Sequence, residues 1–479
     1  MEVIKIFFPE LFLATASLFL LIINSFAVKR SFLKYLSFLS LFVLSLVILL
    51  LSNSSIPPQT EYSQTFLILK SHYLFRIILF VFGIVLYISL YRFLIQERYL
   101  NEFSFFLGAV LSFLSLMTAS QNLLLAFLLM EAISFGFYLL LSFYRRNLLC
   151  LEAGLKYFFL GTLSSIFFFT GLFLIYYSSL EINLFQALAK VASFKMGYFT
   201  LGLILIFSSL AFKLGASPFH FWLPEVYQGS PLPVFPILIA FSKLAFAVFL
   251  SNLVLVSLNS GWIYLPKEAL YGLFYLLSIS SMVIGNFLAL KQRELKRLLA
   301  YSSISHVGYL LTMFAIPWSM ENLKIYYGYI FIYALTNFGI FLALATLIDF
   351  KQIKIPVDTF KDNLKNQNFL ILLSLLVILF SLAGLPPSAG FVTKFFLLLE
   401  IVKQGSYILA LVLLSTSLLS LYYYFRLINP LLAVLKEGLV ERSYEKTDLN
   451  EIFITLVITA ISLYLFFSTF KPSFIFFFN

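Results

Sequence analysis

Apolar runs of about 20 residues, the length that crosses a bilayer as an α-helix, follow one another along this chain. Of its 479 residues, 62% are hydrophobic and 11% charged, whereas about 25% of the residues in a soluble domain are charged. The sequence therefore predicts an all-α polytopic membrane protein with about fourteen transmembrane helices. The predicted spans lie near residues 8–27, 33–51, 73–94, 103–119, 122–143, 154–177, 197–217, 231–256, 267–290, 298–317, 325–348, 368–400, 406–428 and 450–470.

The distribution of basic residues predicts an orientation in the membrane. The chain carries a net charge of +11, but its lysines and arginines cluster in short loops, which is not the pattern of a nucleic-acid-binding patch. Most lie in the loops after odd-numbered spans: Lys29, Arg30, Lys34, Arg92, Arg98, Arg145, Arg146, Lys291, Arg293, Lys296, Arg297, Lys351, Lys354, Lys361, Lys365, Lys436, Arg442 and Lys446. We therefore expect these loops to be cytoplasmic and both termini to face the opposite side.

The first apolar run is predicted to be a retained span. Ala14-Thr15-Ala16 resembles a signal-peptide cleavage site, but the run continues to Ala27 and no basic region precedes it. The single cysteine, Cys150, excludes an intrachain disulfide and a cysteine-ligated iron–sulfur cluster. The sequence contains no phosphate-binding loop, catalytic triad or metal-ligand cluster, so we expect no cofactor or metal in this chain.

Two spans are interrupted by proline. The seventh breaks between Lys213 and Pro218, and the twelfth breaks at Pro386 and Pro387, before Gly390. Proline removes a backbone donor and forces the helix to unwind, which at membrane depth is tolerated only inside protein or beside a wet cavity. Broken helices at matching positions of two halves are typical of inverted-repeat transporters.

These breaks predict a division into two five-helix repeats. We expect an N-terminal three-helix segment (1–100), a first repeat (101–258), a second repeat (259–430), and a C-terminal loop with the last span (431–479).

Five ionisable side chains lie inside apolar runs: Glu131, Lys213, Lys243, His306 and Lys394. A charge at the bilayer centre costs roughly 3 kcal/mol, and such residues commonly mark ion or proton pathways. The five are predicted to form a proton relay, in which Glu131 and Lys213 are a candidate cross-helix pair. The alternatives are static ion pairs, charged caps at the broken helix ends, and a histidine that is only hydrogen-bonded.

Lys156 and His220 are weaker candidates. Lys156 follows Glu152 by four residues near the start of a span, so an interfacial ion pair is the first expectation. His220 follows the seventh span and is more consistent with packing than with catalysis.

Three blocks resemble the antiporter-like subunits of proton-pumping NADH:quinone oxidoreductase, respiratory complex I. They are Phe212–Val234 (FKLGASPFHFWLPEVYQGSPLPV), Lys296–Tyr309 (KRLLAYSSISHVGY) and Leu382–Lys394 (LAGLPPSAGFVTK). Within that family the chain is most similar to the N-type subunits. Lys394 stands where M-type subunits carry glutamate, and the chain ends soon after the last span, where L-type subunits continue into a lateral helix.

The resemblance implies fourteen helices in two inverted five-helix repeats, with helices 7 and 12 broken. It implies that Glu131 pairs with Lys213, that Lys243 and His306 form a central relay, and that Lys394 is the exit-side residue. Lys156 matches a sixth-helix lysine of the family. Flavin, iron–sulfur clusters and quinone are expected in partner subunits, which include M-type, L-type and small membrane subunits. The expected location is the bacterial cytoplasmic (inner) membrane.

The expected function is proton conduction, coupled to quinone reduction in other subunits. Three alternatives remain: a multi-subunit cation/proton antiporter, the membrane module of a hydrogenase-type complex, and a structural spacer. The antiporter would favour a glutamate in the twelfth span, and the spacer predicts silent substitutions at all five buried sites.

Overall fold

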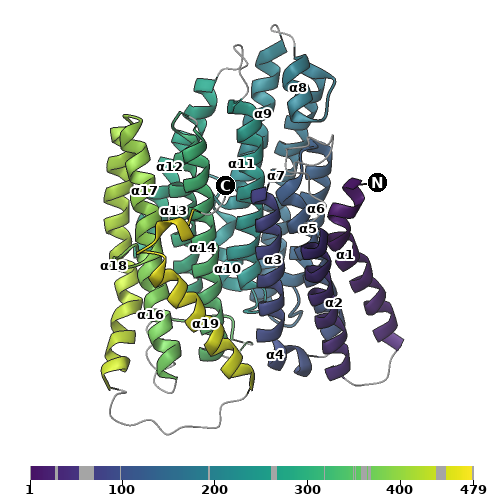
Figure 1. Ribbon diagram of the computed structural model, residues 1–479, viewed down its shortest axis with the longest axis vertical. Helices are drawn as coiled ribbons and strands as arrows, with labels where there is room; N and C mark the ends of the chain where they lie inside the picture. Colours follow the sequence, from purple (N-terminus) through teal and green to yellow (C-terminus); the bar gives the residue numbers. More distant parts are fainter. Residues whose placement is uncertain are drawn as a thin grey trace. The chain divides into compact units, whose positions relative to one another are not determined.

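The computed structural model is entirely helical apart from isolated bridges and turns in the part of the chain that it describes (Figure 1). The described residues are 2–26, 31–52, 70–97, 99–191, 195–259, 267–317, 319–348, 350, 352–357, 364, 368–437 and 449–476. This confirms the predicted all-α membrane class. Eight of the basic loop residues used to predict orientation lie outside these ranges: Lys29, Arg30, Arg98, Lys351, Lys361, Lys365, Arg442 and Lys446.

The chain forms two compact units. Unit 1 comprises Met1–Ser209 and Ala245–Leu265, and unit 2 comprises Leu210–Leu244 and Pro266–Asn479. The predicted boundaries after residues 100, 258 and 430 describe the two five-helix repeats and not these compact units. That division stays a prediction.

Unit 1 is built from the N-terminal helices. They are α1 (Glu2–Phe26), α2 (Ser31–Ser52), α3 (Lys70–Ser89), α4 (Tyr91–Gln96), α5 (Leu100–Ala119), α6 (Leu123–Leu141), α7 (Leu148–Ser179), α8 (Leu184–Lys190), most of α9 (Met196–Leu214) and the later part of α11 (Ser242–Asn259).

Unit 2 contains the remaining helices. They are α10 (Trp222–Gly229), the π-helical η3 (Ile237–Phe241), α12 (Lys267–Leu290), α13 (Leu295–Leu311), η4 (Thr312–Phe314), α14 (Met320–Leu347), α16 (Phe369–Ala383), α17 (Ala389–Lys403), α18 (Tyr407–Glu437), α19 (Leu449–Phe467) and η5 (Pro472–Phe474).

The helices coincide with the predicted spans. Twelve helical segments in the described ranges are long and apolar enough to cross a bilayer. The two other predicted spans coincide with α13 and with the consecutive helices α16 and α17. The total number of crossings and the inverted repeat stay predictions.

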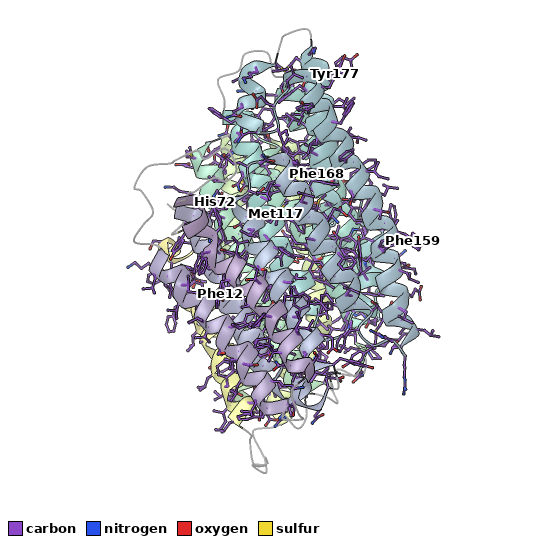
Figure 2. All side chains as sticks on the ribbon, turned by 90° about the vertical axis from the view of Figure 1, so that its right-hand side faces the viewer. Phe12, His72, Met117, Phe159, Phe168 and Tyr177 are labelled. Carbon is purple, nitrogen blue, oxygen red and sulfur yellow. The ribbon has the colours of Figure 1, made fainter. Side chains whose placement is uncertain are left out.

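The outer face of unit 1 is apolar, as a lipid-facing surface requires. In Figure 2, Phe159 and Tyr177 of α7 project from the edge of the helix, and both side chains are exposed. Met117 and Phe168 are fully buried in the same unit. Apolar residues outside as well as inside are expected where the solvent is lipid.

Glycine allows α12 and α13 to approach closely in unit 2. A methyl group added at Gly285 of α12 would lie 2.6 Å from the Ser305 backbone nitrogen of α13. A methyl group at Gly308 of α13 would lie 2.7 Å from the Met282 backbone nitrogen of α12. In both cases the added methyl group would meet backbone atoms of the facing helix, which cannot change rotamer as a side chain can. The two helices would therefore have to move apart.

Gly285→Ala should therefore destabilise the protein by about 1–3 kcal/mol, the usual cost of overpacking. Gly272→Ala, on the same helix, is the matched control because a methyl group there meets nothing within 4 Å. The control should be neutral or slightly stabilising, since alanine favours helix over glycine. Thermal unfolding of the two purified variants checks this, and equal midpoints would contradict the close approach.

Candidate functional site

The first helix break is present in unit 2 and has a local cause. α9 ends at Leu214, and Gly215 follows with φ +77°, a left-handed conformation that glycine adopts without strain. Pro218 then prevents the helix from continuing, and α10 begins at Trp222. The indole Nε1 of Trp222 donates a 3.0 Å hydrogen bond to the Phe212 carbonyl oxygen, which occupies one of the carbonyls freed at the end of α9.

The second break repeats this chemistry. α16 ends at Ala383, Gly384 follows with φ +78°, and Pro386 and Pro387 separate it from α17. Gly390 lies directly against α16, since a methyl group there would lie 1.8 Å from the Ser381 carbonyl oxygen.

Lys394 of α17 lies over this break. Its Nζ donates to the Ala383 carbonyl oxygen at 3.1 Å and to the Leu382 carbonyl oxygen at 3.3 Å. These are carbonyls at the C-terminus of α16, where the helix dipole favours a cation. The side chain therefore caps a helix end, as one of the sequence alternatives proposed, while it is 7% exposed.

Among the described helices that are long enough to cross a bilayer, Lys243 lies in the most completely buried one. Residues 237–254 are buried throughout, and the π-helical turn η3 ends immediately before α11, which carries Lys243. Such π-helical turns are rare and frequent at functional sites. Lys243 Nζ donates a 2.7 Å hydrogen bond to Ser303 Oγ and lies 5.9 Å from the ring centroids of Tyr227 and Tyr333.

His306 is held between two tyrosines. Its Nδ1 is 2.7 Å from the Tyr329 hydroxyl, and its Nε2 is 3.2 Å from the Tyr424 hydroxyl, which also contacts Ser302. In a neutral imidazole one ring nitrogen donates and the other accepts, so one tyrosine donates to the ring and the other accepts from it. Exchange between the two tautomers reverses both bonds.

A small cavity joins His306 to Lys394 within unit 2. Its polar lining also includes Tyr329, Tyr333 and Thr336 of α14, Ser381 of α16 and Thr393 of α17, and it has room for about one water molecule. The Tyr333 hydroxyl is buried and has no hydrogen-bond partner within the described part of the chain. The Tyr333 ring also lies 5.9 Å from Lys243 Nζ, so Tyr333 lies beside Lys243 as well as in the cavity that His306 and Lys394 line.

Lys243 and Lys394 contact neutral groups in the described part of the chain. Within the described ranges, no carboxylate lies within salt-bridge distance of Lys243 or Lys394. An ammonium here has no fixed counter-charge, so losing its proton removes a buried charge and breaks no ion pair. The observed contacts thus disfavour the static ion-pair alternative for these two residues.

The other predicted residues are divided between the units. Glu131 of α6 lies in unit 1, where Ser165 of α7 donates a hydrogen bond to its carboxylate. Lys213 is buried near the end of α9 in unit 2, so its pairing with Glu131 stays a prediction. Lys156 forms the expected half-exposed ion pair with Glu152 on α7.

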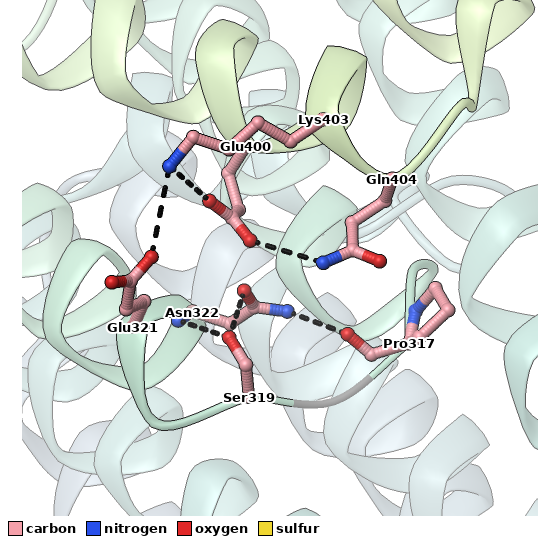
Figure 3. Close-up of polar contacts among 7 residues, drawn as sticks. All are labelled: Pro317, Ser319, Glu321, Asn322, Glu400, Lys403 and Gln404. Atoms are coloured by element: carbon pink, nitrogen blue, oxygen red, sulfur yellow. Dashed lines mark hydrogen bonds and ion pairs between the residues drawn. The ribbon is translucent and has the colours of Figure 1, made fainter.

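Sequence reasoning missed a buried carboxylate in unit 2, shown in Figure 3. Glu400 of α17 is 3% exposed and accepts from Lys403 Nζ at 3.3 Å and Gln404 Nε2 at 3.2 Å. Lys403 also lies 3.7 Å from Glu321, in the first turn of α14, so the cluster ties the end of α17 to the start of α14. The sequence did contain a signal for this residue, because Glu400 is the one acidic residue in the apolar run that carries Lys394.

The tyrosines Tyr329, Tyr333 and Tyr424 were also missed. Tyrosines are common at membrane interfaces, so a tyrosine in a membrane protein is not by itself a signal of a buried site. Their position in the interior of long apolar segments was the signal that could have singled them out. No group of three metal-ligating side chains is found among the described residues.

The fold and the site together define the class of protein. It is a polytopic α-helical membrane protein with two broken helices and buried ionisable residues, as in transporters of small ions.

Comparison with known proteins gives the family. The family model for the transmembrane region of NADH:quinone oxidoreductase and Mrp antiporter subunits matches residues 120–420. NADH-quinone oxidoreductase subunit N 2 of Thermodesulfovibrio yellowstonii is 35% identical over 339 residues, 71% of each chain. The subunit N of Pelagibacter ubique is 32% identical over 442 residues, 90% of this chain and 89% of that one. The chain belongs to this family and, within it, groups with subunit N of NADH-quinone oxidoreductases.

A solved structure agrees with this placement. A chain of respiratory complex I from Thermus thermophilus superposes with a TM-score of 0.78 at 27% identity, covering 97% of both chains. The family resemblance inferred from the three sequence blocks is thereby confirmed.

Proposed function

We propose that this chain is a membrane-arm subunit of a proton-pumping NADH:quinone oxidoreductase and conducts protons through unit 2. The observation that carries the proposal is the network formed by Lys243, His306 and Lys394. All three are buried, and no carboxylate contacts the two lysines among the described residues. A water-sized cavity joins His306 to Lys394, and Tyr333, which lines that cavity, also lies beside Lys243.

The network suggests how a proton moves. The Lys243 ammonium donates to Ser303, and the Tyr333 ring lies between Lys243 and the cavity beside His306. The imidazole accepts a proton at one nitrogen and releases one at the other, since each nitrogen has its own tyrosine partner. Lys394, which lines the same cavity, is the next acceptor and leads toward the exit.

The remaining predicted residues extend this path. Glu131 and Lys213 form the pair whose separation alters the proton affinity of the lysine, and Lys156 is an outlying member. The chain performs no redox chemistry of its own. Flavin, iron–sulfur clusters and quinone belong to partner subunits, which include M-type and L-type antiporter-like subunits.

We place the protein in the bacterial cytoplasmic (inner) membrane, with both termini on the non-cytoplasmic side. The basic residues of the loops support this orientation.

The direct test is to purify the native complex that contains this chain and to reconstitute it in liposomes. Flavin and iron–sulfur subunits should copurify, and proton translocation should require both NADH and a quinone. Cation-driven proton exchange without NADH would instead identify an Mrp-type antiporter, which the family model also includes.

Tyr424→Phe tests the tyrosine contact of His306. It removes the hydroxyl beside Nε2, and losing a buried hydrogen bond of about 1–1.5 kcal/mol should slow proton translocation by about fivefold to tenfold. Tyr423→Phe is the matched control, because the Tyr423 hydroxyl donates to Asn286 at 3.1 Å and not to His306. Tyr424→Phe removes the contacts with His306 and Ser302, and Tyr423→Phe removes the contact with Asn286, so an equal loss of translocation in both would contradict a specific role for Tyr424.

A further inference from the structure

A second small cavity lies in unit 1, outside the site described above. It is formed where α5 ends and α6 begins, against the start of α8 and the later part of α11. Ser120 and Gln121 contribute from the α5–α6 junction, and Asn252, Leu253 and Val256 contribute from α11.

Four buried polar atoms belong to residues that line this cavity, and they have no hydrogen-bond partner within the described part of the chain. They are Ser120 Oγ, both amide atoms of Gln121, and Asn252 Oδ1. Ser120 is 0%, Gln121 5% and Asn252 1% exposed. The other amide atom of Asn252, Nδ2, donates a 2.8 Å hydrogen bond to the Thr118 carbonyl oxygen, which fixes the side chain against the end of α5.

Such a concentration of unpaired atoms requires a partner. Buried polar groups in folded proteins are nearly always hydrogen-bonded to protein or to ordered water. The α5–α6 junction is also non-helical at Ser120 and Gln121. In a membrane protein, such backbone is tolerated only where it is buried or lines a wet cavity.

The polar groups that line the cavity indicate which kind of ligand it can bind. The polar side chains are three amides, of Gln121, Asn183 and Asn252, and the Ser120 hydroxyl, which supply both donors and acceptors, and the described lining contains no ionisable side chain. The space admits about one water molecule, and a water needs two to four polar partners. A bare cation would instead need about six oxygen ligands.

We propose that this cavity is a water-binding site, in which one ordered water bridges Ser120, Gln121 and Asn252. The water completes the hydrogen bonds of the α5–α6 junction and joins it to α11. By the predicted orientation this junction lies at the non-cytoplasmic end of unit 1, so the water comes from that side. The proposal does not depend on proton conduction by unit 2.

The test is a cryo-electron-microscopy map of the whole complex, at a resolution that shows ordered water elsewhere in the membrane arm. We expect one water peak about 2.7–3.2 Å from at least two of the three side chains. An empty cavity would overturn the proposal, and so would a peak with five or six oxygens at about 2.4 Å, which identifies a cation.

Two variants give an independent reading. Gln121→Met keeps the side-chain length but removes both amide atoms, so the water peak should be lost and the thermal midpoint should fall. Val256→Ala changes an apolar wall of the same cavity and should keep the water. If Gln121→Met raises the midpoint, the wild-type amide is unpaired and the water site is wrong. Ser120→Ala, which removes one hydroxyl, provides the same comparison if Gln121→Met does not assemble.

Discussion

Replacing Lys243 with methionine should lower proton translocation by the complex at least tenfold while the subunit still assembles. A positioned proton-transfer group contributes about 10²–10⁴-fold to rate, and methionine has no proton to exchange. Methionine also matches the length and apolar surroundings of the buried lysine stem, so packing around Ser303 and the tyrosines should persist. NADH-driven acidification of liposomes that contain the purified complex measures this effect.

Lys296→Met is the control for losing any buried lysine. Lys296 is fully buried at the start of α13 and donates a 2.8 Å hydrogen bond to the Ser230 carbonyl oxygen, but it is outside the proposed relay. The Lys296→Met variant should be less stable than the wild type, but its rate of proton translocation per assembled complex should be unchanged. Wild-type translocation in Lys243→Met would remove Lys243 from the path, and an equal loss in both variants would show that the defect is structural.

The helix breaks could be predicted from the sequence because their cause is local. Gly215 and Pro218 end α9, and Gly384 and Pro386 end α16, through backbone chemistry that neighbouring residues decide. The apolar runs likewise predicted where helices lie, because the length of a span is set by the bilayer.

The partners of the buried residues could not be predicted in the same way. His306 meets Tyr329 and Tyr424, 23 and 118 residues away along the chain, and this depends on how three helices are rotated against one another. A charged cap at a broken helix end was one of the alternatives for Lys394, but the two carbonyls that it contacts, those of Leu382 and Ala383, depend on how α17 packs beside the end of α16. Periodicity in a uniformly apolar segment carries little information about which face is buried.

One buried ion pair in unit 1 was missed for a different reason. Glu10 and Arg76 lie within the first and third predicted spans but near their starts, and neither was singled out among the ionisable residues of the apolar runs. In the structure both are inside helices and almost fully buried, on α1 and α3. Two charges that each look peripheral in sequence can thus meet in the interior, where they neutralise each other.

This ion pair should make a large contribution to the stability of unit 1. Arg76 Nε and Nη2 donate to the two Glu10 carboxylate oxygens at 2.7 and 2.8 Å, and Ser115 Oγ donates to one of them at 2.6 Å. The guanidinium also lies 4.6 Å from the centroid of the Phe7 ring. Arg76→Met leaves a buried carboxylate without its cation, and breaking a buried pair in this way costs about 3–5 kcal/mol.

The double variant Glu10→Leu/Arg76→Met separates two effects on stability. One is the net stabilisation by the ion pair, and the other is the destabilisation caused by a buried carboxylate without its cation. It removes both charges, and replacement of a buried pair by apolar residues is often neutral or stabilising. We therefore expect Arg76→Met to lower the amount of assembled subunit and its thermal midpoint, and the double variant to restore most of both. If the double variant is as unstable as the single one, the packing of α1, α3 and α5 requires the two hydrogen bonds between Arg76 and Glu10. If Arg76→Met matches the wild type, water reaches the carboxylate and the pair is not buried in the assembled protein.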